Sequence, residues 1–235
     1  LERIDDATVL AETTTNNQGR YSFDTSTLTE EALRVRVLAQ AVGPRVNITV
    51  YSDVDAEALW SVTNEDSGSF NIEISEPYAA GAFNVVSLAK TMGDVLESLV
   101  PPDIPPPLAV HWDASSIPFC GSCFYVDKSL LVFTGEEGDE DAHDDSVVLH
   151  ELAHYLEATW GSYDNPGGRH NRERVGPSLA WSEGFATWFQ AAIRGVANYV
   201  DLRPQNAYVL NLQDPPADKM GVDGELPDAL LSEAL

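Results

Sequence analysis

The sequence SVVLHELAHYLEATW (146–160) contains the pattern His-Glu-x-x-His within an apolar run. Its apolar residues recur at a helical spacing, which predicts a buried helix over residues 146–160. Residues four apart share one face of a helix, so His150 and His154 can direct their imidazoles at one metal ion. Glu151 points about a quarter-turn away, where its carboxylate can act as a general base on a water molecule.

A catalytic zinc ion needs a third protein ligand and an open fourth position. The metzincin pattern would require a glycine and a histidine where Glu157 and Trp160 stand, so that class is excluded. The other common third ligand is a glutamate on a following helix. A second helical pattern over residues 178–194 contains WSEGFATWF (181–189), which supplies Glu183.

Together, HELAHYLE (150–157) and AWSEGFA (180–186) resemble the gluzincin zinc peptidases, and the resemblance covers roughly residues 83–200. It implies that the cofactor is Zn²⁺ and that the metal ligands are His150, His154 and Glu183. It also implies that Glu151 is the general base and that the substrate is a protein or peptide.

One position departs from the gluzincin pattern. Many gluzincins have an aspartate four residues after the ligand glutamate, where it hydrogen-bonds a ligand histidine, but Thr187 stands there in this chain. A threonine hydroxyl can accept the imidazole proton but carries no negative charge. We therefore expect part of this orienting contact to come from elsewhere, and Glu157 is one candidate.

Two residues of the loop between the predicted helices are candidates for a further catalytic role. Peptide hydrolysis needs a donor for the developing oxyanion. The loop from 161 to 177 contains Tyr163 and His170. We expect His170 to be the donor, with Tyr163 as the alternative.

The first third of the chain is typical of β structure. LRVRVL (33–38) and VNITVY (46–51) alternate apolar with polar residues, and the short predicted strands suggest an antiparallel sandwich. TTTNNQGRYSF (13–23) resembles the transthyretin-like, carboxypeptidase-regulatory-like domains of secreted bacterial enzymes, with Gly19, Tyr21 and Phe23 at the matching positions.

The hydrophobic period changes to a helical one over residues 83–99. The segment PPDIPPP (101–107) and predicted strands at 108–112, 119–126 and 130–134 follow. We predict the α+β class, with a β-sandwich accessory domain over residues 1–78. Residues 79–235 would form a zincin-type catalytic domain with a short mixed sheet, an active-site helix and a glutamate helix.

Two further motifs have simpler interpretations. The only cysteines form CGSC (120–123), which we predict to be a disulfide across a hairpin neck because no second pair accompanies it. Seven of the ten residues from Glu136 to Asp145 are acidic. They lack the glycine and the final glutamate of an EF-hand. We predict a solvated loop whose Asp144 and Asp145 cap the following helix.

The composition sets limits on partners and location. The 235 residues contain 13 basic and 38 acidic side chains, giving a net charge of −25, which excludes most nucleic-acid binding. No apolar window is long enough to span a membrane. An acidic, lysine-poor surface suggests adaptation to salt, so we expect a secreted or cell-surface protein.

Three interpretations remain open from the sequence alone. The first is a zinc peptidase, the second a surface adhesion or binding protein with a structural or vestigial metal site, and the third a zinc hydrolase of a non-peptide amide or ester. The helical pattern DALLSEAL (228–235) has no stop signal. It therefore suggests that a C-terminal fragment of the same precursor is a partner.

Overall fold

The computed structural model describes residues 1–16, 18–27, 32–52, 61–65, 71–75, 77–113, 116–168 and 175–214. Over these residues the protein is a mixed α and β structure with three α-helices and several sheets, in agreement with the α+β class. His170 and the segment 228–235 lie outside the described residues. Within the described ranges, none of the helices combines the length and apolar character needed to span a bilayer.

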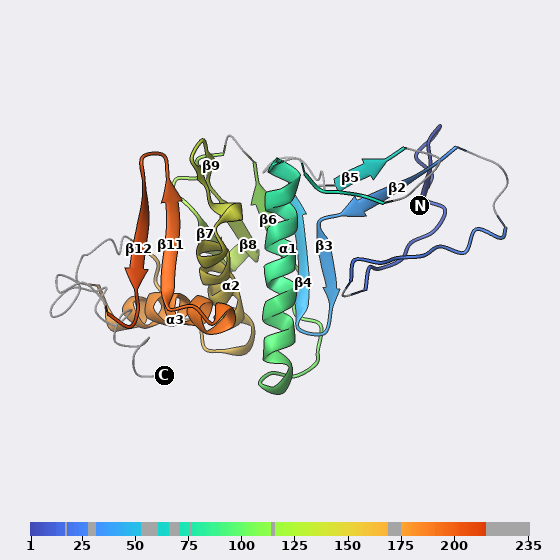
Figure 1. Cartoon of the computed structure of the whole chain (residues 1–235). Helices are drawn as coiled ribbons and strands as arrows, with labels where there is room; N and C mark the ends of the chain where they lie inside the picture. Colours follow the sequence, from blue (N-terminus) through green and yellow to red (C-terminus); the bar gives the residue numbers. More distant parts are fainter. Residues whose placement is uncertain are drawn as a thin grey trace.

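A five-stranded mixed sheet lies at the centre of the molecule (Figure 1). Its three middle strands are parallel, and each edge strand is antiparallel to its neighbour. In spatial order the strands are β3 (Gln40–Gly43), β4 (Val46–Tyr51), β6 (Leu108–Trp112), β8 (Leu130–Phe133) and β7 (Cys123–Tyr125). The predicted strand 119–126 is therefore reduced to β7, while 108–112 is confirmed.

Helices α1 (Pro77–Val95) and α2 (Asp145–Trp160) pack against this sheet and against each other, and α3 (Pro177–Arg194) packs across α2 (Figure 1). One apolar core joins them to the sheet: it includes Met92 of α1, Leu152 of α2 and Phe133 of β8, all about 1% exposed or less. The helices predicted at 146–160 and 178–194 are confirmed. A short 3-10 helix η1 (Leu96–Ser98) ends the helix predicted at 83–99.

Two hairpins complete this part of the molecule. The hairpin β11 (Asn198–Arg203) and β12 (Asn206–Asn211) stands beside α2 (Figure 1), and the sequence did not predict it. The smaller hairpin β9 (Gly135–Glu136) and β10 (Asp139–Glu140) precedes α2. The two hairpins touch where Gly138 meets Pro204: a Cβ atom on Gly138 would lie 2.9 Å from Pro204 Cα.

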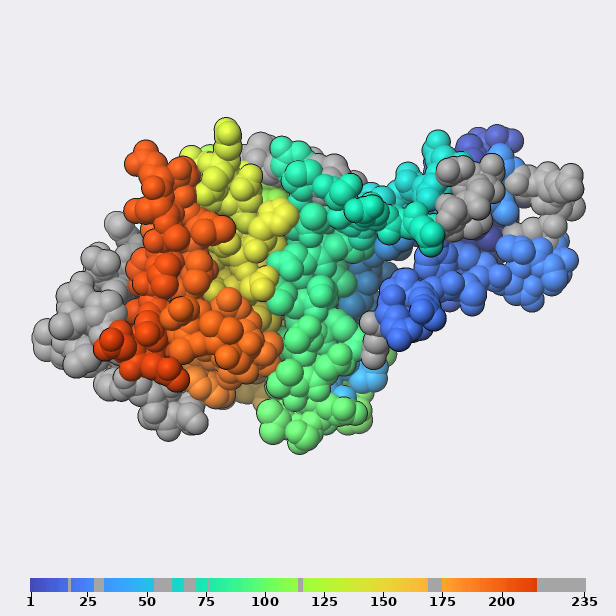
Figure 2. Space-filling view, viewed as in Figure 1, coloured from blue at the N-terminus to red at the C-terminus, as the bar shows by residue number. Residues whose placement is uncertain are grey.

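The N-terminal residues form a narrower lobe that projects from the main body (Figure 2). Its sheet has the antiparallel order β1 (Glu2–Arg3), β2 (Leu33–Leu38) and β5 (Ser61–Asn64). The sequence also predicts a strand, a turn and a second strand over residues 7–14 and 21–23, but these segments are not strands. Their residues contribute only one isolated bridge, between Val9 and Glu2.

The chain runs between the two sheets more than once, so the boundary predicted near residue 78 is wrong. Strands β3 and β4 precede that position but belong to the central sheet, where β4 pairs with β6. Strand β5 then returns to pair with β2. A cut at residue 78 would separate β4 from its hydrogen-bonded neighbour and from helix α1, which packs on it.

The structure also corrects the two simpler motifs. Cys120 and Cys123 do form a disulfide, but it closes the turn that leads into β7 and does not bridge two strands. The acidic run is not a solvated loop throughout, since Asp141 and Asp144 are each 6% exposed. Asp144 precedes α2 without capping it, because its carboxylate accepts a hydrogen bond from the Leu202 amide instead.

Candidate metal centre

Helix α2 presents the two histidines of the motif at one site. Its apolar residues face the core, and Leu149, Leu152 and Ala153 are at most 1% exposed. This burial fixes the rotation of the helix and directs the remaining face, with His150 and His154, toward α3. The two imidazole rings lie with their centroids 5.0 Å apart.

Helix α3 brings Glu183 to the same point. It begins with Pro177 after Gly176 and ends at Arg194, before Gly195, which has the left-handed φ of 65° common after helices. The Oε2 atom of Glu183 lies 3.1 Å from Nε2 of His150 and 3.5 Å from Nε2 of His154. The three side chains are 6 to 12% exposed, so their donor atoms converge in a nearly dry environment.

This group has the donor set and spacing of a metal site. One donor atom from each of His150, His154 and Glu183 lies within 4.8 Å of the others. Two imidazole nitrogens and one carboxylate oxygen are the ligands of many catalytic zinc sites. Both Nε2 atoms face the centre while both Nδ1 atoms contact hydroxyl groups elsewhere, which is the arrangement that two Nε2 ligands require.

The charges of the three side chains are strongly coupled. Burial alone would lower the pKa of His154, but the hydrogen bond and charge of Glu183, with Glu151 and Glu157, raise it to about 9. Burial alone would raise the pKa of Glu183, but His150 and His154 hold it well below its ordinary value. The centre therefore favours positive charge beside the carboxylate, as a cation-binding site must.

Each histidine has a second contact that orients its ring. Thr187 Oγ1 lies 3.3 Å from Nδ1 of His150, at the position where many gluzincins have an aspartate. Ser182 Oγ lies 3.2 Å from Nδ1 of His154 and donates a 2.7 Å hydrogen bond to Glu157 Oε2. Glu157 is 7% exposed and Ser182 is fully buried, so a chain of buried hydrogen bonds links the Glu157 carboxylate to the imidazole of His154.

Asn165 orients the candidate carboxylate ligand, and sequence reasoning missed it. Its amide nitrogen donates to Glu183 Oε1 at 3.1 Å and to Ser182 Oγ at 3.0 Å. Its own Oδ1 accepts a 2.7 Å hydrogen bond from the Gly167 amide, which holds the loop in place. Glu183 thus has one oxygen toward the histidines and the other toward Asn165.

Glu151 and two tyrosines complete the surroundings. Glu151 is 7% exposed, and its charge contributes to the raised pKa of His154 next to it. Burial, followed by the charges of Glu183, Glu157 and Glu151, raises the pKa of Tyr163 to about 12, so its phenol stays protonated at working pH. Tyr199 of β11, which the sequence did not indicate, places its ring centroid 5.9 Å from that of His150.

Of the predicted site residues, His150, His154 and Glu183 converge. The charge of Glu151 contributes to the raised pKa of His154, and the charges of the three glutamates contribute to the raised pKa of Tyr163, so both residues lie near this centre. His170 lies outside the described residues.

No protein-family model matches this chain, and no curated protein matches it in sequence. The assignment of a function therefore depends on the geometry of this centre.

Proposed function

We propose that this protein is a zinc-dependent peptidase of gluzincin type. The observation that carries the proposal is the convergence of His150 Nε2, His154 Nε2 and a Glu183 carboxylate oxygen, with Glu151 beside them on α2. Three protein ligands leave a fourth position open, which distinguishes catalytic from structural zinc sites. When bound in such a site, Zn²⁺ acts as a Lewis acid and lowers the pKa of water toward neutrality.

The residues of the chain have separate roles in this proposal. Glu151 accepts a proton from the attacking water and later delivers it to the leaving amine. Tyr163 is a neutral hydrogen-bond donor for the developing oxyanion, because its pKa of about 12 keeps the phenol protonated. His170 remains the other candidate for that donor. Thr187, Ser182 and Asn165 orient the ligand side chains.

The proposal includes a finer description of the fold. Helices α2 and α3 with the central sheet would be the zincin-type catalytic unit, and the sheet β1-β2-β5 would belong to a transthyretin-like accessory sandwich. The disulfide between Cys120 and Cys123 supports a secreted or cell-surface location, since disulfides persist in oxidising compartments. A protein or peptide is the proposed substrate.

The test combines metal analysis with the substitution Glu151→Gln. We expect one zinc per purified chain, and hydrolysis of a fluorescently labelled unfolded protein by the wild type. Glu151→Gln keeps the size and hydrogen-bonding reach of the side chain but removes its basicity. It should retain zinc and lower kcat by about 10²–10⁴-fold.

The matched control is Glu97→Gln, which makes the same change at an exposed position in η1. It should leave both zinc content and kcat unchanged. Full hydrolysis by Glu151→Gln would refute the proposed base. Zinc-loaded wild type that hydrolyses neither unfolded protein nor model amides and esters would favour the binding protein, and hydrolysis of amides or esters alone would favour a non-peptide hydrolase.

A further inference from the structure

A second group of acidic side chains lies outside the candidate zinc centre, where β10, β11 and the start of α2 meet. Asp139 belongs to β10, Asp141 to the short 3-10 helix η3 (Asp141–His143), and Asp201 to β11. One carboxylate oxygen from each lies within 4.8 Å of the others. Asp139 and Asp141 come from the acidic run before α2. Asp201 lies 60 residues after Asp141, beyond both helices of the candidate zinc centre.

Asp141 has an unsatisfied oxygen at this point. Its Oδ2 atom accepts a hydrogen bond from the Ser122 hydroxyl, while its Oδ1 atom is buried and has no hydrogen-bond partner among the residues that the structure describes. The residue is 6% exposed, so water does not solvate this oxygen freely. A buried carboxylate oxygen without a partner is costly, and an unplaced ion is one of its standard explanations.

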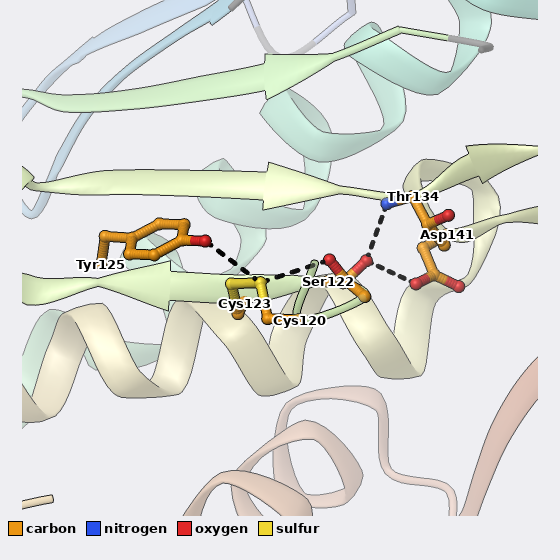
Figure 3. The surroundings of a disulfide bond; sticks show 7 residues. Cys120, Ser122, Cys123, Tyr125, Thr134 and Asp141 are labelled. Carbon is orange, nitrogen blue, oxygen red and sulfur yellow. Dashed lines mark hydrogen bonds between the residues drawn. A yellow bond between two sulfur atoms is a disulfide. The ribbon is translucent and has the colours of Figure 1, made fainter. Parts of the chain in front are cut away.

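The surroundings hold Asp141 in a fixed orientation. Ser122 lies between the two cysteines of the disulfide, and its Oγ accepts a 3.0 Å hydrogen bond from the Thr134 amide while donating to Asp141 (Figure 3). The disulfide loop and strand β8 therefore position one carboxylate oxygen and leave the other directed away from Ser122 (Figure 3).

The local charge is strongly negative. Burial, together with the charges of Asp201, Asp139 and Asp144, raises the pKa of Asp141 to about 8 despite the Ser122 hydrogen bond. Burial is also the main cause of the raised pKa values of Asp139 and Asp144. Arg203 pairs with Oδ2 of Asp201 at 2.6 Å and supplies one positive charge to these four carboxyl groups.

We propose that Asp139, Asp141 and Asp201 bind one calcium ion. All the donors are oxygens, which suit Ca²⁺ and Mg²⁺, whereas zinc sites in proteins include nitrogen or sulfur ligands. Mg²⁺ keeps several of its waters and is usually held by one or two carboxylates, so three protein carboxylates favour Ca²⁺. The three oxygens lie within 4.8 Å of one another, close enough to share one ion, and backbone carbonyls and water would complete its shell.

A bound calcium ion would link β11, through Asp201, to the segment that leads into α2, through Asp139 and Asp141. The Leu202 amide already donates to Asp144, and the Val200 amide donates to Ser146 Oγ at 3.0 Å. Tyr199, two residues before Asp201, packs its ring against His150. Calcium would therefore stabilise the strand that covers one side of the candidate zinc centre, without itself being part of that centre.

The test uses the full chain with equimolar zinc held constant. Calorimetric titration with CaCl₂ should show one site per chain. Thermal unfolding is then compared in about 10 mM CaCl₂, in MgCl₂ at the same concentration, and in NaCl of equal ionic strength. For a Kd in the 10⁻⁴–10⁻³ M range of extracellular calcium modules, calcium should raise Tm by about 3–10 °C above NaCl, and magnesium by less.

Three variants locate the site. Asp141→Asn and Asp201→Asn should abolish the calcium-specific shift, and the half-buried Asp139→Asn should weaken binding at least tenfold even if the other two fold poorly. Glu137→Gln removes an exposed charge from the same acidic run and should keep the full shift. The proposal is overturned if CaCl₂ and NaCl raise Tm equally, or if Asp139→Asn and Glu137→Gln bind calcium alike.

Discussion

Ser182 carries the effect of a buried charge to the candidate metal centre. Its hydroxyl donates to Glu157 and lies 3.2 Å from Nδ1 of His154. His154 thus receives indirectly a negative charge of the kind that an aspartate provides directly in many gluzincins. Such contacts fix the tautomer of a ligand histidine and raise its basicity.

We expect Ser182→Ala to lower zinc affinity by about 10–100-fold, the usual effect of losing an orienting contact. The substitution leaves Glu157 buried without its donor and leaves His154 without an acceptor at Nδ1. Competition with a chromophoric zinc chelator measures the change. The matched control is Ser178→Ala on the same helix, which removes the hydroxyl that donates to Asp164 of the preceding loop and should bind zinc as the wild type does. Equal zinc affinity in both variants would show that Ser182 does not orient the ligand.

Of the two candidates for oxyanion stabilisation, Tyr163 is the one that lies within the described residues. We expect Tyr163→Phe to lower kcat by about 10²–10³-fold with little change in KM, because the lost hydrogen bond would form only in the transition state. Steady-state kinetics on a labelled peptide measures both constants. Tyr199→Phe makes the same change beside His150 and should have a much smaller effect on kcat. If Tyr163→Phe kept the wild-type kcat and His170→Gln lost activity, the oxyanion donor would be His170 and not Tyr163.

The candidate ligands could be predicted from the sequence, but their supporting residues could not. His150 and His154 are related by helical spacing, and Glu183 stands in a recognisable pattern. The sequence makes Glu157 one candidate for orienting a ligand histidine. Its contact with His154 goes through Ser182, however, and depends on how α3 is rotated against α2. Asn165 reaches Glu183 only because of the conformation of its loop, which no periodicity encodes.

At the scale of elements, the contact between the two hairpins depends on Gly138. This residue has a φ of 82°, and a Cβ atom would lie 2.9 Å from Pro204 Cα. Gly138→Ala should therefore cost about 1–2 kcal/mol for the left-handed backbone and about 1–3 kcal/mol more for overpacking. Thermal or urea unfolding measures the loss.

Gly195→Ala separates these two contributions. Gly195 has a similar φ of 65°, but no atom of the described residues lies within 4 Å of the position of its Cβ. It should cost only the backbone share, so Gly138→Ala should lower Tm by roughly twice as much. Equal losses in the two variants would mean that the hairpins separate easily, and that β11 is not held against the β9–β10 turn as closely as the structure shows.

The helices were more predictable than the hairpins. Helices α2 and α3 have long apolar periods, and their predicted ends differ from the observed ends by at most one residue. Strand β11 contacts α2 and α3, but its burial does not alternate and β12 is largely exposed, so no two-residue period marks the hairpin. The prediction of a solvated loop for the acidic run is wrong for a related reason: Asp201, which faces this run, is distant in sequence, and no local pattern joins them.

At the scale of the whole molecule, the change of hydrophobic period near residue 78 marks a change of secondary structure and not a domain boundary. Strands β2 and β3 follow one another across the buried Ala39, so one stretch of chain contributes to both sheets. Strand β5 then returns to the N-terminal sheet. Pairing between β4 and β6 is non-local, and a sequence window cannot show it.

The net charge of −25 belongs to the whole chain and predicts a response to salt. Raising NaCl from about 0.1 to 1 M shortens the Debye length from about 10 to 3 Å, which weakens repulsion among the excess acids. The same salt weakens exposed ion pairs such as Arg3–Asp6, but such exposed pairs contribute little to stability. We therefore expect Tm at pH 7, with zinc and calcium held constant, to rise as NaCl increases.

Repeating the measurement near the sequence pI of about 4.2 provides the control, because the net charge there is close to zero. The rise with NaCl should then largely disappear, whereas a general effect of salt on apolar burial would persist at both pH values. Because NaCl screens diffusely, its effect should also be the same in Asp201→Asn as in the wild type. A Tm that falls with NaCl at pH 7 would show that the few ion pairs outweigh the repulsion, and that the acidic surface is not an adaptation to salt.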